Sequence, residues 1–163
     1  MNQDQDTTMK YQENPKKYKF MKAALNEAKK AAAKNEVPVG AVVVFQDKII
    51  ARAHNLRESK QLIEAHAEFL AMKKAAKKIG SWRLEDCDIY VTMEPCPMCA
   101  GAMIQSRISH LYYAVDDPKA GVVNSMMKIF EFPFNHHVNV ESGILADESR
   151  TLIQDFFKKL RKK

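Results

Sequence analysis

The sequence has few cysteines and no long apolar run, and each absence excludes a class of protein. Only three cysteines occur in 163 residues. An odd, small number argues against a disulfide framework and suits a reducing compartment. No run of about 18 apolar residues is present, so we expect no membrane-spanning helix. The N-terminal residues, MNQDQDTTMKYQENPKKYK, have no apolar core, so we expect no secretory signal there. We therefore expect a cytoplasmic protein.

The composition is that of one folded domain. Apolar residues make up 46% of the chain and charged residues 28%, which is ordinary for a protein with a buried core. Residues 1–15 are polar and aperiodic, so we expect a flexible N-terminal segment followed by a single domain over residues 16–163. The net charge is +6, and the chain ends in KKLRKK. This charge favours an anionic partner such as nucleic acid, although a lysine-rich surface is commonly only a solvated face.

The spacing of apolar residues predicts strands that alternate with helices. We expect helices over residues 18–35, 66–79 and 97–108, near 125–130 and at the C-terminus, and strands over 39–45, 48–54, 87–93, 110–115 and 137–142. Strand-helix-strand connections imply parallel pairing, and a hairpin at residues 46–48 adds an antiparallel pair. The predicted fold class is therefore α/β, with a mixed five-stranded sheet and helices on both faces. In the last helix, apolar residues recur on one face, and we expect Phe156 or Phe157 to lie in the core.

Two of the three cysteines form the motif Pro95-Cys96-x-x-Cys99 at the start of a predicted helix. Cys96 and Cys99 then lie on one helical face, one turn apart. The partial positive charge of a helix N-terminus favours thiolates there, and two thiolates at this spacing form half of a tetrahedral zinc site. Cys87 lies at the entry to a strand, and we expect it to pack in the core.

His66 is the best candidate for the third ligand, because it opens a helix and precedes Glu68 by two residues. Inside a helix, the side chains of residues two apart point about 200° away from each other. At the start of a helix, however, both side chains can reach a point beyond the helix end. The remaining histidines have no such neighbours, and we expect them on the surface or in the core: His54, His110, His136 and His137. One histidine and two cysteines leave the fourth position to water, which is the catalytic arrangement of zinc.

A zinc site of about zero net charge polarises water weakly and needs a base. We interpret Glu68 as that base, which takes a proton from water and passes it to a ring nitrogen and a departing amine. The predicted reaction is hydrolytic deamination of a heteroaromatic base. A thioredoxin-like redox pair is an alternative, but it leaves His66 and Glu68 without a role.

His66-Ala67-Glu68 together with Pro95-Cys96-x-x-Cys99 resembles the cytidine-deaminase superfamily. Within it, the chain is similar to the bacterial tRNA-specific adenosine deaminases from Tyr18 to Arg161. The segments that carry this likeness are EVPVGAVVV, AHAE, EPCPMCAGAMIQSRI, DDPKAG, FNHHV, GILADE and FFKKLR. The resemblance implies a three-layer α/β/α fold, a homodimer, a Zn²⁺ ion, and conversion of the wobble adenosine of a tRNA anticodon to inosine.

The resemblance also implies a set of substrate contacts. These are Asn55, the backbone near Ala67, the loop residues Asp116, Asp117 and Lys119, then Asn135, and finally Phe157 and Arg161 in the last helix. In this chain Asn135 is followed by two histidines, where the family more usually has Asn-His-Arg, so one cation of that loop is missing. Each contact also has a structural interpretation, such as a turn at Asn55 or at Asp116 and Asp117.

Two rival functions use the same motifs. One is a deaminase of free guanine or of cytosine nucleosides, and the positive charge, the basic terminal helix and DDPKAG favour RNA over it. The other is a zinc-stabilised RNA-binding module without catalysis, which would not need the carboxylate of Glu68.

Overall fold

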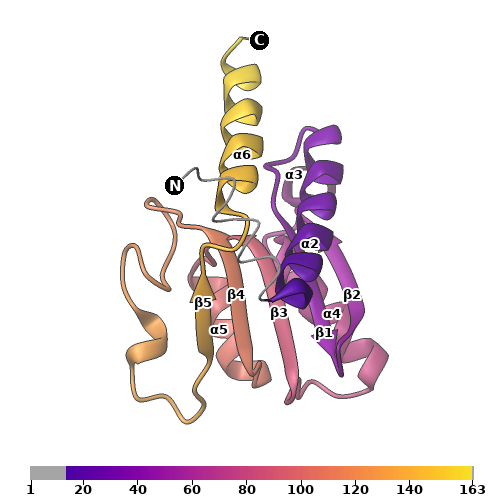
Figure 1. Ribbon diagram of the computed structural model, residues 1–163, viewed down its shortest axis with the longest axis vertical. Coiled ribbons are helices and arrows are strands. Elements are labelled where there is room, and N and C mark those ends of the chain that lie inside the picture. The colour runs from indigo at the N-terminus through magenta and orange to yellow at the C-terminus, as the bar shows by residue number, and fades with distance from the viewer. Residues whose placement is uncertain (1–13, 163) are drawn as a thin grey trace.

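The sheet has five strands, and helices cover both of its faces (Figure 1). The computed structural model describes residues 14–162. The strands are β1 (Gly40–Phe45), β2 (Lys48–His54), β3 (Cys87–Met93), β4 (His110–Val115) and β5 (Asn139–Ser142). The helices are α2 (Pro15–Ala33), α3 (Arg57–Lys60), α4 (Ala67–Ile79), α5 (Pro97–Ser106) and α6 (Ala146–Arg161), with a 3₁₀ helix η1 (Ile129–Glu131). None of the helices in this described part is both long and apolar enough to cross a membrane.

The order of strands across the sheet is β2-β1-β3-β4-β5. β1 runs antiparallel to both of its neighbours, β2 and β3, whereas β3, β4 and β5 run parallel to one another. Because β1 is antiparallel to both β2 and β3, those two strands point in the same direction with β1 between them. Helix α4 lies in the connection from β2 to β3. The predicted mixed sheet and three-layer α/β/α fold are confirmed. The pairing of β1 with β3 adds a second antiparallel ladder that the sequence did not predict.

The hairpin between β1 and β2 closes at the predicted place. Gln46 and Asp47 have φ angles of 50° and 61°, as in a two-residue type I′ turn. β1 is buried along almost its whole length, as its continuous apolar run predicts. It therefore forms the centre of this half of the sheet.

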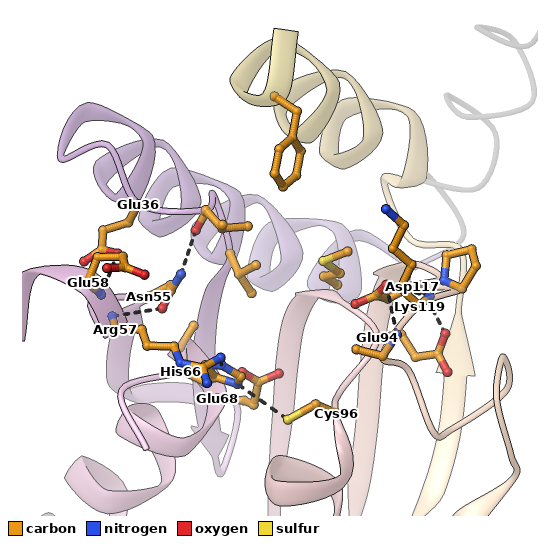
Figure 2. A pocket seen from close by; sticks show the side chains of 17 residues that line it. Glu36, Asn55, Arg57, Glu58, His66, Glu68, Glu94, Cys96, Asp117 and Lys119 are labelled. Atoms are coloured by element: carbon orange, nitrogen blue, oxygen red, sulfur yellow. Dashed lines mark hydrogen bonds between the residues drawn. The ribbon is translucent and has the colours of Figure 1, made fainter. Parts of the chain in front are cut away.

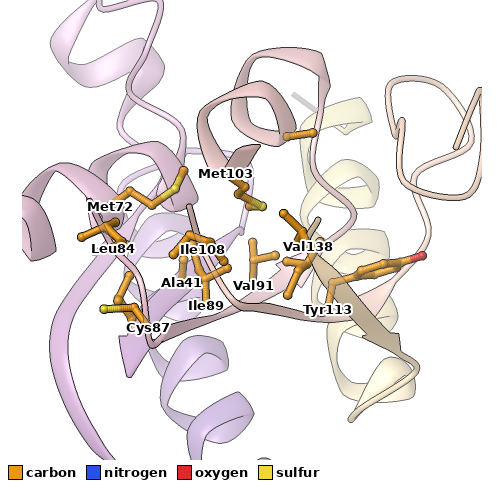
Figure 3. Close-up of a cluster of buried hydrophobic side chains, with 14 of the residues drawn as sticks. Ala41, Met72, Leu84, Cys87, Ile89, Val91, Met103, Ile108, Tyr113 and Val138 are labelled. Carbon is orange, nitrogen blue, oxygen red and sulfur yellow. The ribbon is translucent and has the colours of Figure 1, made fainter. Parts of the chain in front are cut away.

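Two apolar cores lie on the two faces of the sheet. On one face, residues of α4 and α5 such as Met72 and Met103 pack against Ile89 and Val91 of β3 (Figure 3). Cys87 belongs to this cluster and is fully buried, so its predicted packing role is confirmed. The second core lies under α2, where the helix packs on the other face of β1 and β3.

Gly40 allows α2 to approach the sheet closely. A Cβ atom at this position would overlap the carbonyl oxygen of Ala24 and the amide nitrogen of Ala28. The backbone of α2 therefore lies directly against the start of β1. This contact fixes the start of β1, and the residue just before it, Val39, lines the cavity described below.

Three expectations for the ends of elements need correction. α2 spans Pro15–Ala33 and not the expected 18–35, and residues 1–13 of the expected flexible segment lie outside the described part. The short helix expected near 125–130 is a 3₁₀ turn at Ile129–Glu131. Neither Phe156 nor Phe157 is a core residue, because Phe156 is half-buried and Phe157 is 39% exposed. The outer turns of α6 project beyond the end of the sheet (Figure 1), so no strand lies beneath them.

Candidate functional site

The candidate site lies where α4 and α5 begin, at the carboxyl end of β3. His66 is the N-cap of α4 and Cys96 is the N-cap of α5, and both have extended backbones. Because His66 precedes the helix, its side chain is not held about 200° away from that of Glu68, as it would be inside a helix. Both side chains can therefore face the same point. Glu68, in the first turn of α4, lies beside the imidazole, and Cys96 faces both of them (Figure 2).

Three side chains form a candidate metal centre. Nδ1 of His66 is 3.5 Å from Sγ of Cys96 and 3.7 Å from Sγ of Cys99. All three ligand atoms lie within 4.8 Å of one another, and no second group of this kind occurs among residues 14–162. The helix N-termini of α4 and α5 both point toward it, and their partial positive charge favours anionic ligands. The structure therefore brings together the three residues that the sequence predicted.

The two cysteines differ in burial and in protonation. Cys99 is fully buried, whereas Cys96 is half-buried and faces the cavity. Hydrogen bonds from Cys99 and His66 lower the pKa of Cys96 to about 4, so this sulfur is a thiolate near neutral pH. The hydrogen bond to Cys96 and burial raise the pKa of Cys99. The centre thus carries a negative charge on the sulfur that faces the cavity, which suits a cation.

Glu68 has the properties of a group that both accepts and donates a proton. Its side chain is only 4% exposed. Burial raises the pKa of Glu68 to about 7. A hydrogen bond from its own backbone and the charge of His66 lower this pKa, but burial has the larger effect. A carboxyl whose pKa is near the working pH is well suited to general acid-base catalysis.

A cavity of about 720 Å³ opens over the candidate centre. Its floor includes His66, Glu68 and Cys96. Its remaining walls come from the segment between α2 and β1, the β2–α3 segment, the end of β3, the loop after β4, and α6 (Figure 2). This volume falls in the usual range for small-molecule sites. The cavity is therefore large enough for a molecule of the size of a nucleoside.

Five of the eight substrate contacts implied by the family resemblance line this cavity: Asn55, Ala67, Asp117, Lys119 and Phe157. The other three, Asp116, Asn135 and Arg161, are exposed and lie outside its lining. Asp116 instead accepts hydrogen bonds from the hydroxyl of Tyr113 at 2.8 Å and from Nδ2 of Asn124 at 3.3 Å. The turn that the sequence offered as an alternative belongs to Asp117, whose Oδ1 accepts hydrogen bonds from the backbone N–H groups of Lys119 and Ala120 at 3.1 and 3.3 Å.

Asn55 combines a structural role with its place in the cavity. It is 8% exposed, and its Oδ1 accepts a hydrogen bond from the backbone N–H of Arg57 at 3.1 Å. Its Nδ2 donates to the carbonyl oxygen of Val37 at 3.2 Å. The side chain therefore connects the end of β2 to the segment just before β1. The same two hydrogen bonds fix its position in the wall of the cavity.

Four charged residues of the cavity were missed by the sequence reasoning: Glu36, Arg57, Glu58 and Glu94. Nη1 of Arg57 lies 3.3 Å from Nε2 of His66. Glu36 is 1% exposed and accepts hydrogen bonds from the backbone N–H groups of Glu58 and Ser59. The sequence offered one signal for these residues, since Glu36 and Glu94 are acidic residues directly beside apolar runs.

Three of the four histidines outside the centre have ordinary partners, and the fourth, His137, is exposed, as expected. His54 donates to Glu27 at 2.9 Å, and His110 donates to Asp88 at 2.9 Å. His136 donates to the carbonyl oxygen of Ile108 at 2.7 Å. These rings hold loops and strands together away from the cavity.

Similarity to known proteins extends over most of the chain. A family model described as MafB19-like deaminase matches residues 15–161. A tRNA-specific adenosine deaminase of Bacillus subtilis (strain 168) is 50% identical over 145 residues, covering 88% of this chain and 90% of that protein. A solved structure from work on A-to-I editing by tRNA:A34 deaminases at the wobble position has a TM-score of 0.80 and 42% identity, covering 82% of this chain and 97% of its own. A solved guanine deaminase from Nitrosomonas europaea has a TM-score of 0.70 and 23% identity, covering 85% of this chain and 83% of its own, which shows a shared fold alone.

Proposed function

The chain belongs to the tRNA-specific adenosine deaminases among the MafB19-like deaminases, and from this membership we propose that it converts the wobble adenosine of a tRNA anticodon to inosine. The observation that carries the proposal is the buried carboxyl of Glu68 beside the cluster of His66, Cys96 and Cys99, at the floor of a cavity of about 720 Å³. A binding module has no need of a carboxyl held near pKa 7 at this point. Catalysis does need one.

The metal in this proposal is zinc, held by Nδ1 of His66 and the sulfurs of Cys96 and Cys99. With Zn–S of about 2.3 Å and Zn–N of about 2.0 Å, a tetrahedral site has nitrogen-sulfur edges of about 3.5 Å. The distances of 3.5 and 3.7 Å in this chain fit that geometry. When bound, zinc acts as a Lewis acid that lowers the pKa of a water molecule and so makes a nucleophile available near neutral pH.

Glu68 carries the protons of the reaction. It accepts a proton from the attacking water as oxygen adds to C6 of the adenine ring. It then gives that proton to the adjacent ring nitrogen, and it carries the second proton of the water to the amino group, which leaves as ammonia. One water is consumed, and the carboxylate is regenerated. Because Glu68 is buried, bulk water does not compete for these protons.

The walls of the cavity would bind the flipped nucleotide and its neighbours. We assign Asn55 and the backbone at Ala67 to the adenosine, and Asp117, Lys119 and Phe157 to the flanking anticodon, because these residues line the cavity. Asp116, Asn135 and Arg161 would contact RNA outside it. The proposal includes a homodimer, a cytoplasmic location, and one deaminase domain over residues 16–163. The net charge of +6 supports an RNA partner.

The main rival is a deaminase of a free base such as guanine. The guanine deaminase above shares 23% identity with this chain, against 50% for the tRNA-specific relative. A redox role for Cys96 and Cys99 explains neither His66 nor Glu68. The substrate test is therefore between RNA and a free base.

Ammonia release separates these two substrate classes directly. Purified, zinc-loaded protein is incubated with an anticodon stem-loop that has adenosine at the wobble position and, separately, with adenine, guanine and cytidine. We expect ammonia from the stem-loop only. Ammonia from guanine or cytidine, with none from the stem-loop, would replace this proposal with a small-molecule deaminase.

A further inference from the structure

Glu94 is a buried carboxylate that the mechanism above does not use. It follows β3 directly, lies two residues before Cys96, and is 3% exposed. Its two oxygens accept hydrogen bonds from four backbone N–H groups and one hydroxyl. The N–H groups belong to Asp117, Val123, Asn124 and Ser125, at 2.9, 3.0, 2.8 and 3.0 Å, and the hydroxyl belongs to Ser125.

All five donors belong to one segment, the loop that follows β4. This loop supplies Asp117, Pro118, Lys119 and Ala120 to the lining of the cavity. Four of the donors come after the lining residues and one comes from within them, so the carboxylate ties both ends of this wall to the end of β3. Figure 2 shows Glu94 close to Asp117 and Lys119, on the side of the cavity away from Asn55 and Arg57.

Gly121 completes the arrangement. A Cβ atom at this position would overlap the carboxyl group of Glu94, so only glycine lets the loop wrap around the carboxylate. The N–H of the next residue, Val122, also donates to the carbonyl oxygen of Pro95 at 3.1 Å. The loop therefore contacts the segment after β3 at two independent positions, the carboxylate of Glu94 and the carbonyl of Pro95.

We propose that Glu94 is a positioning residue that holds the loop of residues 116–125 in the shape that binds the nucleotides flanking the target adenosine. This inference rests on the proposed function. A buried carboxylate is costly unless its oxygens are satisfied, and hydrogen bonds to a charged acceptor are the strong ones. Here that strength is concentrated on one loop, whose residues face the cavity. Glu94 therefore acts on substrate binding through Asp117 and Lys119, without touching the reacting atoms.

Two variants perturb this contact from opposite sides. Glu94→Gln keeps the size of the side chain but puts an NH₂ group against backbone donors, so some of these donors lose their acceptor. Gly121→Ala keeps the carboxylate and displaces it with a methyl group. Glu27→Gln is the matched control, because Glu27 is also a buried carboxylate, 5% exposed, but it bonds to Lys30 and His54 and does not line the cavity.

Steady-state kinetics on an anticodon stem-loop tests the substrate role. Losing one or two hydrogen bonds to a charged group corresponds to a roughly 10- to 100-fold change in a binding constant. We expect KM to rise by that factor in both Glu94→Gln and Gly121→Ala. The kcat should stay within about threefold of the parent, because Glu68 and the metal ligands are unchanged. Zinc content should remain that of the parent protein. Loss of zinc, or a fall in kcat with unchanged KM, would overturn the inference in favour of a role at the metal centre.

Amide hydrogen exchange tests the same contact without any activity. In both variants the amides of residues 117–125 should exchange faster than in the parent, and in Glu27→Gln they should not. If the parent protein fails to deaminate the stem-loop, the proposed function fails, but faster exchange in this loop still supports the structural part of the inference. Unchanged exchange in both variants would overturn it, whatever the kinetics.

Discussion

At the scale of single residues, the ligands of the metal centre lie at the starts of α4 and α5, whereas the walls of the cavity come from several separate segments. Cys96, Cys99 and His66 could be assembled because each lies at a helix start, where chain direction and the helix dipole limit what a side chain can do. The walls depend on contacts between distant segments. Glu94, for example, accepts a hydrogen bond from the backbone N–H of Ser125, and the sequence around either residue does not predict that contact.

The role of Glu68 leads to a specific prediction. Glu68→Gln removes the group that moves protons and keeps its size and its buried place beside His66. We expect the variant to keep its fold and zinc but to lose activity by at least about 10² to 10⁴-fold, the usual contribution of a general acid-base group. Elemental analysis and single-turnover deamination of a stem-loop measure the two quantities. Glu85→Gln, an exposed glutamate paired with Arg83, is the control and should retain full activity. Zinc loss in Glu68→Gln would make this residue a ligand instead.

The ligands themselves give a second prediction. Cys96→Ala and Cys99→Ala should each lose zinc, because three protein ligands leave no substitute when one is removed. Cys87→Ala should keep about one zinc per chain, since Cys87 is fully buried in the apolar core away from the centre. Elemental analysis of the three variants is sufficient. Full zinc in both Cys96→Ala and Cys99→Ala would refute the ligand assignment.

At the scale of elements, the sequence predicted the bounds of β3 and β4 correctly, but it did not predict α3 or the exposed position of α6. β3 and β4 have the predicted bounds, 87–93 and 110–115, because an apolar run between turn residues leaves few alternatives. α3 was not predicted, since its four residues, Arg57–Lys60, have no apolar periodicity and depend on Glu36 to bind their N–H groups. The apolar stripe of α6 was predicted correctly as a stripe but wrongly as core. Amphipathic spacing cannot say whether the apolar face meets the sheet or another partner.

The position of α6 gives a prediction for RNA binding. Removing residues 158–163 deletes exposed cations, while Phe157 stays at the cavity wall and Phe156 stays half-buried. We expect weaker stem-loop binding with unchanged zinc content. If this segment makes two or three phosphate contacts, the slope of log K against log salt should become shallower by roughly 1.5 to 2 units.

A charge-only variant is the control for this truncation. Changing Lys158, Lys159, Arg161 and Lys162 to Gln keeps the helix and should reproduce most of the change in slope. The last residue, Lys163, lies outside the part of the chain that the structure describes. Identical slopes for the parent and both variants would remove this end of α6 from the RNA site.

At the scale of the whole molecule, the fold explains why the site lies where it does. β3 and β4 are parallel neighbours, and the segments that follow their carboxyl ends carry Cys96 on one side and the loop with Asp117 and Lys119 on the other. Ligand sites in open α/β sheets form at this edge. The sequence predicted parallel strands and the residues that follow them, and therefore most of the site. It could not predict that β1 inserts beside β3, which brings Asn55, at the end of β2, to the opposite wall of the same cavity.

Position-specific detection of inosine tests the central claim most directly. Zinc-loaded protein is incubated with two anticodon stem-loops of equal composition, one with adenosine at the wobble position and one with that adenosine exchanged with a neighbouring loop nucleotide. The products are then sequenced. We predict inosine at the wobble position of the first stem-loop, none in the second, and none in either with Glu68→Gln. Inosine at equal levels in both stem-loops, or in neither while a free base is deaminated, would contradict the account.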